Sequence, residues 1–163
     1  MNEFLILYTL LKHNANIYEI KKFINRHFAP FAELSTGAII PALNRLENIN
    51  CVKSENSMSD GGLKRTVYSV TEDGINKING YLSSEIDAAP QLARRETEVL
   101  LLVLGDEIFN EEQIKLLKNK IRFALERQVN IIKNAICSGK MNLEFLNTEL
   151  IYTEAKLRML ADE

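Results

Sequence analysis

The spacing of apolar residues changes near Asn50 and changes back near Thr71, and this double change limits the fold more than any other feature. Before Asn50, apolar side chains recur every three or four residues, which is the period of an amphipathic helix. Between the two points they alternate with polar side chains, as in half-buried strands. We therefore predict three helices, a two-stranded hairpin and a fourth helix, in that order.

Capping residues set the expected ends of the first helices. The first helix is expected to end near Lys12, and Asn16 is placed to cap a second helix from Ile17 to about Phe28. Ser35 is a candidate cap for the third helix. The expected buried stripe of the third helix is Ile39, Leu43 and Leu46.

The two expected strands are separated by a segment rich in Ser, Asp and Gly. Asp60, Gly61 and Gly62 are expected to form its flexible tip, and Lys64 and Arg65 stand where the chain returns. Three helices followed by a hairpin are the arrangement of a winged helix-turn-helix. In that fold the second helix of the motif enters the major groove of DNA.

The second half of the chain, residues 84–163, is expected to be helical throughout. Pro90 is placed to start one helix, Asn110 caps a long one, and a last helix begins near Leu143. Along the last two helices, residues of one face recur in steps of three and four, as in the seam of a coiled coil. These two seams predict a homodimer. The seam residues are Ile114, Leu117, Ile121, Gln128, Leu143, Leu146, Leu150 and Leu157. The predicted fold class is mainly α, with a winged helix-turn-helix domain over residues 1–83 and a helical dimerisation domain over residues 84–163.

Composition and motifs argue against several classes of protein. The chain has 163 residues, with 20 Lys or Arg against 22 Asp or Glu, so any nucleic-acid surface depends on local placement of basic groups. Cys51 and Cys137 lie far apart, and His13 and His27 lack partners at ligand spacing, so neither a disulfide nor a metal site is expected. Nucleophile elbows, phosphate loops and dinucleotide fingerprints do not occur, so we expect no enzyme and no cofactor. Without a leader or a membrane span, the expected location is the cytoplasm.

Three stretches of the first half carry a family signature. They are Asn16 to Ile20, Gly37 to Glu47, and Gly61-Gly62 through Arg65 to Gly74. In order and spacing they resemble the opening of the second helix, the third helix and the wing of the PadR family of bacterial transcriptional regulators. The chain departs from that pattern at Ile40, where the family usually has Tyr, and at Asn44, where it usually has a basic residue. The resemblance implies a dimer that binds double-stranded DNA, released in some members by phenolic or drug-like inducers.

The third helix and the wing supply the candidate DNA contacts. Polar groups at a helix N-terminus favour phosphate, while Asn44 suits adenine, Arg45 suits guanine or phosphate, and Ile40 suits a thymine methyl. The alternative is that Ser35 only caps the helix and Arg45 is only a solvated residue. Tyr18 either bonds a phosphate or packs in the core. The candidates are Tyr18, Ser35, Thr36, Gly37, Ile40, Asn44, Arg45, Lys53, Lys64 and Arg65.

Together these inferences predict a homodimeric repressor on an inverted-repeat operator. A small aromatic effector is expected among Phe4, Tyr8, Phe109 and Phe123, between the winged head and the helical domain; the alternative is that these aromatics are plain core. The competing function is a dimeric protein-interaction or ligand-binding module with a winged-helix fold and little DNA binding. That module would bind its partner with little salt dependence, whereas DNA binding falls steeply with salt.

Overall fold

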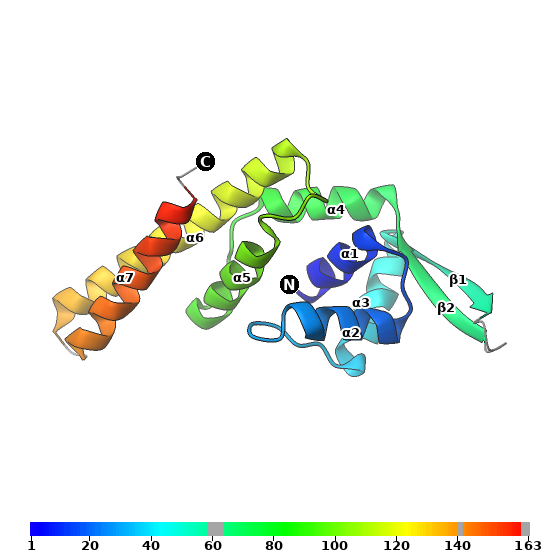
Figure 1. Ribbon diagram of the computed structural model, residues 1–163, viewed down its shortest axis with the longest axis horizontal. Coiled ribbons are helices and arrows are strands. Elements are labelled where there is room, and N and C mark those ends of the chain that lie inside the picture. Colours follow the sequence, from blue (N-terminus) through cyan, green and yellow to red (C-terminus); the bar gives the residue numbers. More distant parts are fainter. Residues whose placement is uncertain (59–63, 140–141, 161–163) are drawn as a thin grey trace. The chain divides into compact units, whose positions relative to one another are not determined.

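The computed structural model describes residues 1–58, 64–139 and 142–160 (Figure 1). The chain divides into two compact units, Met1–Leu82 and Ser83–Glu163. Seven helices and one two-stranded sheet occur among the described residues, which confirms the mainly α class. Within that part of the chain, no helix is long and apolar enough to cross a bilayer.

Three helices form the body of the first unit. They are α1 (Asn2–Lys12), α2 (Ile17–His27) and α3 (Thr36–Asn48). Asn16 accepts a hydrogen bond from the Glu19 N–H at 3.0 Å, and the Glu19 carboxylate accepts one from the Asn16 N–H at 2.9 Å. This reciprocal capping box fixes the start of α2, so the predicted cap is confirmed.

A hairpin follows the three helices, as predicted. Strands β1 (Val52–Met58) and β2 (Lys64–Val70) pair antiparallel. An isolated bridge between Ala15 and Tyr68 attaches β2 to the turn between α1 and α2. The residues predicted for the tip lie outside the described residues; they are Asp60, Gly61 and Gly62.

The fourth helix, α4 (Glu72–Ser83), completes the winged unit. The Thr71 hydroxyl accepts a hydrogen bond from the Gly74 N–H at 3.2 Å, so Thr71 caps this helix. The fully buried core of the unit comes from all four helices. Its largest members are Leu5, Ile6, Leu7, Ile20, Ile24, Ile39, Leu43, Leu46, Ile78 and Leu82, and they include the stripe predicted for α3.

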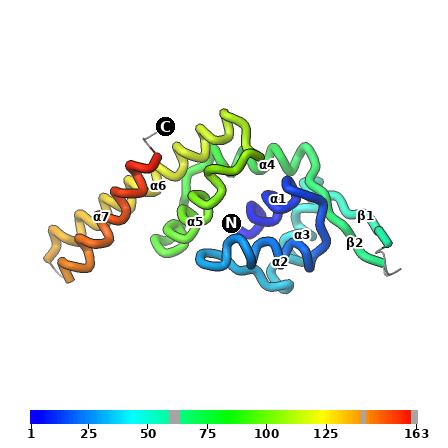
Figure 2. Tube along the Cα trace, viewed as in Figure 1, coloured from blue at the N-terminus to red at the C-terminus, as the bar shows by residue number. Residues whose placement is uncertain are grey.

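The second unit contains three helices, α5 (Pro90–Val103), α6 (Glu111–Ser138) and α7 (Leu143–Met159). Figure 2 shows α6 and α7 running side by side in opposite directions. Asn110 caps α6 with a second capping box, and Gly139 ends it with φ of 64°, a conformation that favours glycine. The core of this unit includes Val99, Leu100, Leu117, Ile121, Leu125 and Leu146.

Candidate nucleic-acid interface

Helix α3 has an exposed face beside its buried one. The Ser35 hydroxyl accepts a hydrogen bond from a backbone N–H three residues later at 3.3 Å, which fixes the first turn. The unpaired N–H groups of that turn, near Thr36 and Gly37, give the helix start a positive potential. Ile40 is 41% exposed and Asn44 is also exposed. Spacings of three and four residues place Gly37, Ile40 and Asn44 on one face, so these candidates form a single surface.

Arg45 lies beside that face, and its guanidinium is held by a residue of α1. Its Nε donates to Oε1 of Glu3 at 3.0 Å, while Oε2 of the same carboxylate lies 3.4 Å from Nζ of Lys77. Burial acts to raise the pKa of the Glu3 carboxyl, but Arg45 and Lys77 outweigh it, so the pKa lies below its ordinary value. Sequence reasoning missed Glu3 because the pair joins residues 42 positions apart.

Tyr18 and Lys53 are both accessible to solvent. Tyr18, near the start of α2, is 70% exposed, so it does not pack in the core. Lys53 on β1 forms an exposed ion pair with Glu55 at 3.1 Å. Because an exposed pair of this kind contributes little stability, it leaves Lys53 able to meet a phosphate.

The wing carries two exposed cations where β2 begins. Lys64 and Arg65 are its first residues, and Nη1 of Arg65 lies 3.7 Å from Oε1 of Glu19. Glu19 belongs to the capping box of α2, so this contact ties the wing to the helix that carries Tyr18. All the predicted DNA-contact residues therefore belong to the winged unit, on α2, α3 with its cap, and the hairpin.

A family model matches most of the winged unit. It describes the transcriptional regulator PadR-like family and covers residues 6–79, from within α1 to within α4. The winged unit thus resembles the PadR-like family of transcriptional regulators. This confirms the resemblance inferred from the sequence motifs.

The similarity of fold to one solved structure extends to the second unit. The match to Bacillus subtilis PadR in complex with operator DNA has 13% identity and a TM-score of 0.51, and covers 97% of this chain and 98% of that one. A PadR family regulator from Clostridium difficile R20291 is 28% identical over 64% of this chain and 98% of its own, with a TM-score of 0.44. The smu.1604c protein of Streptococcus mutans UA159 is 19% identical over 98% of this chain and 96% of its own, with a TM-score of 0.47. No curated protein sequence matches the chain.

The predicted dimerisation seams are partly used within the chain itself. Leu117, Ile121 and Leu146 are buried inside the second unit. They are buried because α6 packs against both α5 and α7. The remaining seam residues are half-buried or exposed; they are Ile114, Gln128, Leu143, Leu150 and Leu157.

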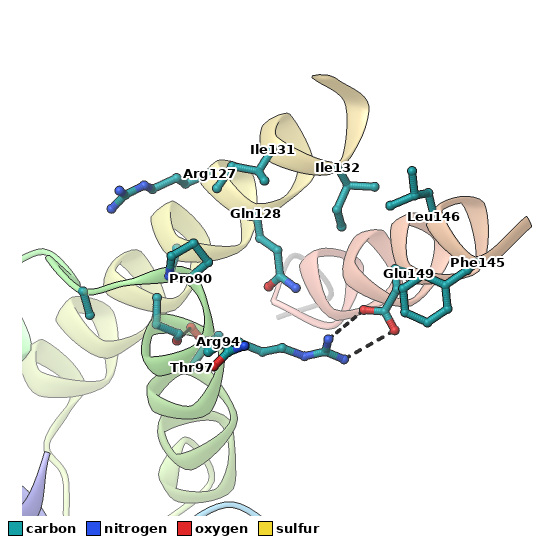
Figure 3. Close-up of a pocket in the computed structure, with 14 residues that line it drawn as sticks. Pro90, Arg94, Thr97, Arg127, Gln128, Ile131, Ile132, Phe145, Leu146 and Glu149 are labelled. Carbon is teal, nitrogen blue, oxygen red and sulfur yellow. Dashed lines mark hydrogen bonds and ion pairs between the residues drawn. The ribbon is translucent and has the colours of Figure 1, made fainter. Parts of the chain in front are cut away.

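A cavity of about 250 Å³ lies between α5, α6 and α7 (Figure 3). Its walls are mainly apolar and include Ile132 and Leu146. On one side Arg94 and Glu149 form a two-pronged ion pair, with N···O distances of 2.9 and 3.5 Å. Such a pair neutralises both charges. Figure 3 shows the Gln128 amide reaching into the space between the helices.

The described lining of this cavity includes none of the four aromatic residues predicted for an effector site. Phe4 and Tyr8 are buried in α1 with ring centroids 6.2 Å apart, and Phe4 stacks on Tyr81 at 4.5 Å. Phe109 is buried in the second unit, whereas Phe123 is exposed on α6. Phe4, Tyr8 and Phe109 therefore serve as core.

Proposed function

We propose that the protein is a cytoplasmic homodimer that binds double-stranded DNA sequence-specifically and represses transcription. Residues 1–83 act as the DNA-binding domain and residues 84–163 as the dimerisation domain, so that two copies of α3 meet an inverted repeat. The observation that carries the proposal is the exposed face of α3, where the helix start, Ile40 and Asn44 lie together. The fold shared with Bacillus subtilis PadR, solved in complex with operator DNA, supports it.

Each part of the candidate interface suits a different part of DNA. The start of α3 and the Ser35 hydroxyl suit a phosphate. Ile40 suits the methyl group of thymine, and the Asn44 amide offers the donor and acceptor that adenine presents in the major groove. Lys64 suits the phosphate backbone, which carries no sequence information, and Arg65 suits the minor groove. Sequence is therefore read at Ile40, Asn44 and Arg45 in the major groove and at Arg65 in the minor groove.

The test is a titration of the purified protein with the duplex immediately upstream of its own coding region, because regulators of this kind often control their own gene. We expect tight binding that weakens as salt rises and that a scrambled duplex cannot compete away. Asn44→Ala should reduce the preference for the upstream duplex by about 1–3 kcal/mol. Asn119→Ala, an exposed change in the second unit, is the control and should leave it unchanged. Equal binding to both duplexes would contradict sequence-specific recognition.

Dimerisation is assigned to the second unit because its apolar surface is incompletely covered. Leu143 is exposed, and Ile114, Leu150 and Leu157 are half-buried, although all four belong to the predicted seams. Gln128 is half-buried too, and a polar residue in such a seam helps to fix the register of the helices. Sedimentation of the purified protein tests this assignment, and a monomer at micromolar concentration would contradict it.

The cavity in the second unit supports regulation by a small, uncharged aromatic effector. Apolar cavities of about 150 Å³ hold benzene, so a volume of about 250 Å³ has room for a two-ring molecule. Arg94 and Glu149 neutralise each other, which disfavours a charged ligand. The Gln128 amide offers both a donor and an acceptor to a hydroxyl group on such a molecule.

Fluorescence titration with 2-naphthol tests the effector site. Ala124→Trp fills the cavity and should abolish binding, whereas Phe123→Ala, one residue away on the exposed surface of α6, should leave it intact. Release of the upstream duplex by 2-naphthol would link the site to regulation. If Ala124→Trp leaves the affinity for 2-naphthol unchanged, the ligand does not bind in this cavity.

A protein-interaction module remains the competing function, and one observation favours it. Arg45, Lys53 and Arg65 are each paired with a carboxylate, so the interface carries less unbalanced positive charge than its sequence suggests. The module predicts no binding to either duplex in the titration above. A pull-down with the tagged protein would then be the next experiment, and its complex should be insensitive to salt.

A further inference from the structure

The two arginines of the candidate interface are each held by a carboxylate from a helix that supports the interface. Glu3 of α1 bonds Nε of Arg45 at 3.0 Å. Glu19 of α2 lies 3.7 Å from Nη1 of Arg65. Helix α3 and the hairpin, which are separate elements, thus each carry an arginine that is held by a carboxylate from a neighbouring helix.

Each of these carboxylates is itself fixed by a second contact. The other oxygen of Glu3 lies 3.4 Å from Nζ of Lys77 on α4. The other oxygen of Glu19 accepts a hydrogen bond from the backbone N–H of Asn16 at 2.9 Å. The position of each carboxylate is therefore set by the fold as well as by the arginine that it holds.

The contacts leave most of each guanidinium available. Arginine has five N–H donors, and the bond to Glu3 uses the Nε–H of Arg45. The side chain of Arg45 remains 60% exposed and that of Arg65 44% exposed. Both side chains can therefore bind a second acceptor without leaving their carboxylates.

We propose that Glu3 and Glu19 are positioning residues for DNA recognition, which hold Arg45 and Arg65 in the orientation that DNA requires. An arginine loses much rotamer freedom when it is immobilised in an interface. Because the carboxylates restrict that freedom before binding, less is lost when DNA arrives. The carboxylates also repel phosphate, but this lowers binding to operator and other DNA alike, so any change in the relative preference comes from the positions of the two arginines. This inference rests on the proposed DNA binding.

The test compares charge-removing substitutions that keep the shape of the side chain. Glu3→Gln and Glu19→Gln remove the negative charge, and glutamine at position 19 can still complete the capping box. Glu33→Gln is the matched control, because Glu33 is exposed and its side chain has no hydrogen bond or ion pair with another described residue. The measured quantity is the ratio of the affinities for the upstream duplex and for the scrambled duplex.

We expect Glu3→Gln and Glu19→Gln each to lower this ratio by about tenfold, within the range of a good base or backbone contact. Glu33→Gln should strengthen binding to both duplexes alike and leave the ratio unchanged. In an Arg45→Ala background, Glu3→Gln should have no further effect on the ratio, since its partner is gone. An unchanged or increased ratio in the Gln variants would overturn the proposal, and an increase would mean that the carboxylates withhold the arginines from DNA.

A measurement without DNA separates this inference from the proposed function. By nuclear magnetic resonance, the Nε–H proton of Arg45 should exchange with water more slowly than that of the exposed Arg26, and the Nη1–H protons of Arg65 more slowly than those of Arg26. Glu3→Gln should accelerate exchange at Arg45 alone. Equal exchange rates at all three arginines would overturn the inference, whereas a wild-type protein without preference for the upstream duplex would overturn the proposed function.

Discussion

Gly74 is the position at which one added methyl group should disturb the winged unit most. A Cβ atom there would overlap the carbonyl oxygen of Cys51 and lie 2.6 Å from Cγ2 of Val70. A backbone carbonyl cannot yield as the end of a long side chain does, so the start of α4 would be pushed from the hairpin. We expect Gly74→Ala to lower the free energy of unfolding by about 1–3 kcal/mol, measured with urea.

Gly80 provides the matched control on the same helix. Nothing described lies within 4 Å of a Cβ atom built at Gly80, so alanine fits there without a clash. Because alanine is the better helix former, Gly80→Ala should raise the free energy of unfolding by about 0.5–1 kcal/mol. A similar loss in both variants would show that the contact with Cys51 is not the cause.

Side chains differ in how far their roles could be predicted from sequence. Asn16 and Ser35 accept hydrogen bonds from the N–H three residues later, and this local relation makes a cap predictable. The partner of Arg45 lies 42 positions away, and only the packing of α1 against α3 brings Glu3 to it. The exposure of Tyr18 likewise depends on how α2 packs, so the sequence left its role open.

At the scale of elements, helix α6 carries a buried cation that ties it to two other segments. Nζ of Lys120 donates to the backbone oxygen of Ser84 at 2.7 Å and lies 3.7 Å from a carboxylate oxygen of Glu96 on α5. Burial lowers the pKa of Lys120, although Glu96 partly opposes this. The Lys120 ammonium group therefore loses its proton at a lower pH in the folded protein than in the unfolded chain.

This difference predicts a pH dependence of stability. Between the lowered pKa and the ordinary value near 10.5, the unfolded chain binds more protons at Lys120, so the stability that this residue confers rises with pH. The free energy of unfolding of wild type relative to Lys120→Met should therefore increase as the pH is raised toward 10.5. Lys115→Met, on the exposed side of the same helix, is the control. A difference that stays flat with pH would contradict the burial of a charged Lys120.

Helix α7 exposes a second apolar stripe that the predicted seam does not contain. Phe145, Tyr152 and Met159 are all exposed and recur every seven residues, which is the repeat of a coiled-coil face. We expect this stripe to meet the partner in the proposed dimer. Tyr152→Glu should raise the dimer dissociation constant on the order of tenfold or more in sedimentation equilibrium. Asn147→Glu, an exposed change on another side of α7, should not.

Elements and their faces were therefore predictable to different degrees. The helices, the hairpin and their order follow from the change of apolar period and from the caps, and the structure confirms them. The same period cannot tell a seam that packs within the chain from one that meets a partner. Leu117 and Leu146 were expected at a dimer interface but are buried within their own unit, while Phe145 was overlooked.

For the whole molecule, charge does not distinguish a DNA-binding protein from other regulators. The chain carries a net charge of −2, and several cations of the interface are balanced by carboxylates. A single winged unit therefore offers few phosphate contacts, and non-specific affinity should be low. Two units joined in a dimer bind with an effective concentration that multiplies their affinities. In the proposed dimer, tight binding should therefore depend on both half-sites being reached at once.

The spacing of the half-sites tests this dependence. In a symmetric dimer, two recognition helices that enter successive major grooves on one face of the duplex lie about 34 Å apart, or roughly ten base pairs from centre to centre. Five base pairs inserted between the half-sites turn one of them to the opposite face of the DNA. We expect a loss of affinity on the order of 100-fold, because only one unit can then bind. The same five base pairs placed outside the half-sites should have no effect, and an equal affinity for all three duplexes would mean that each winged unit binds DNA independently.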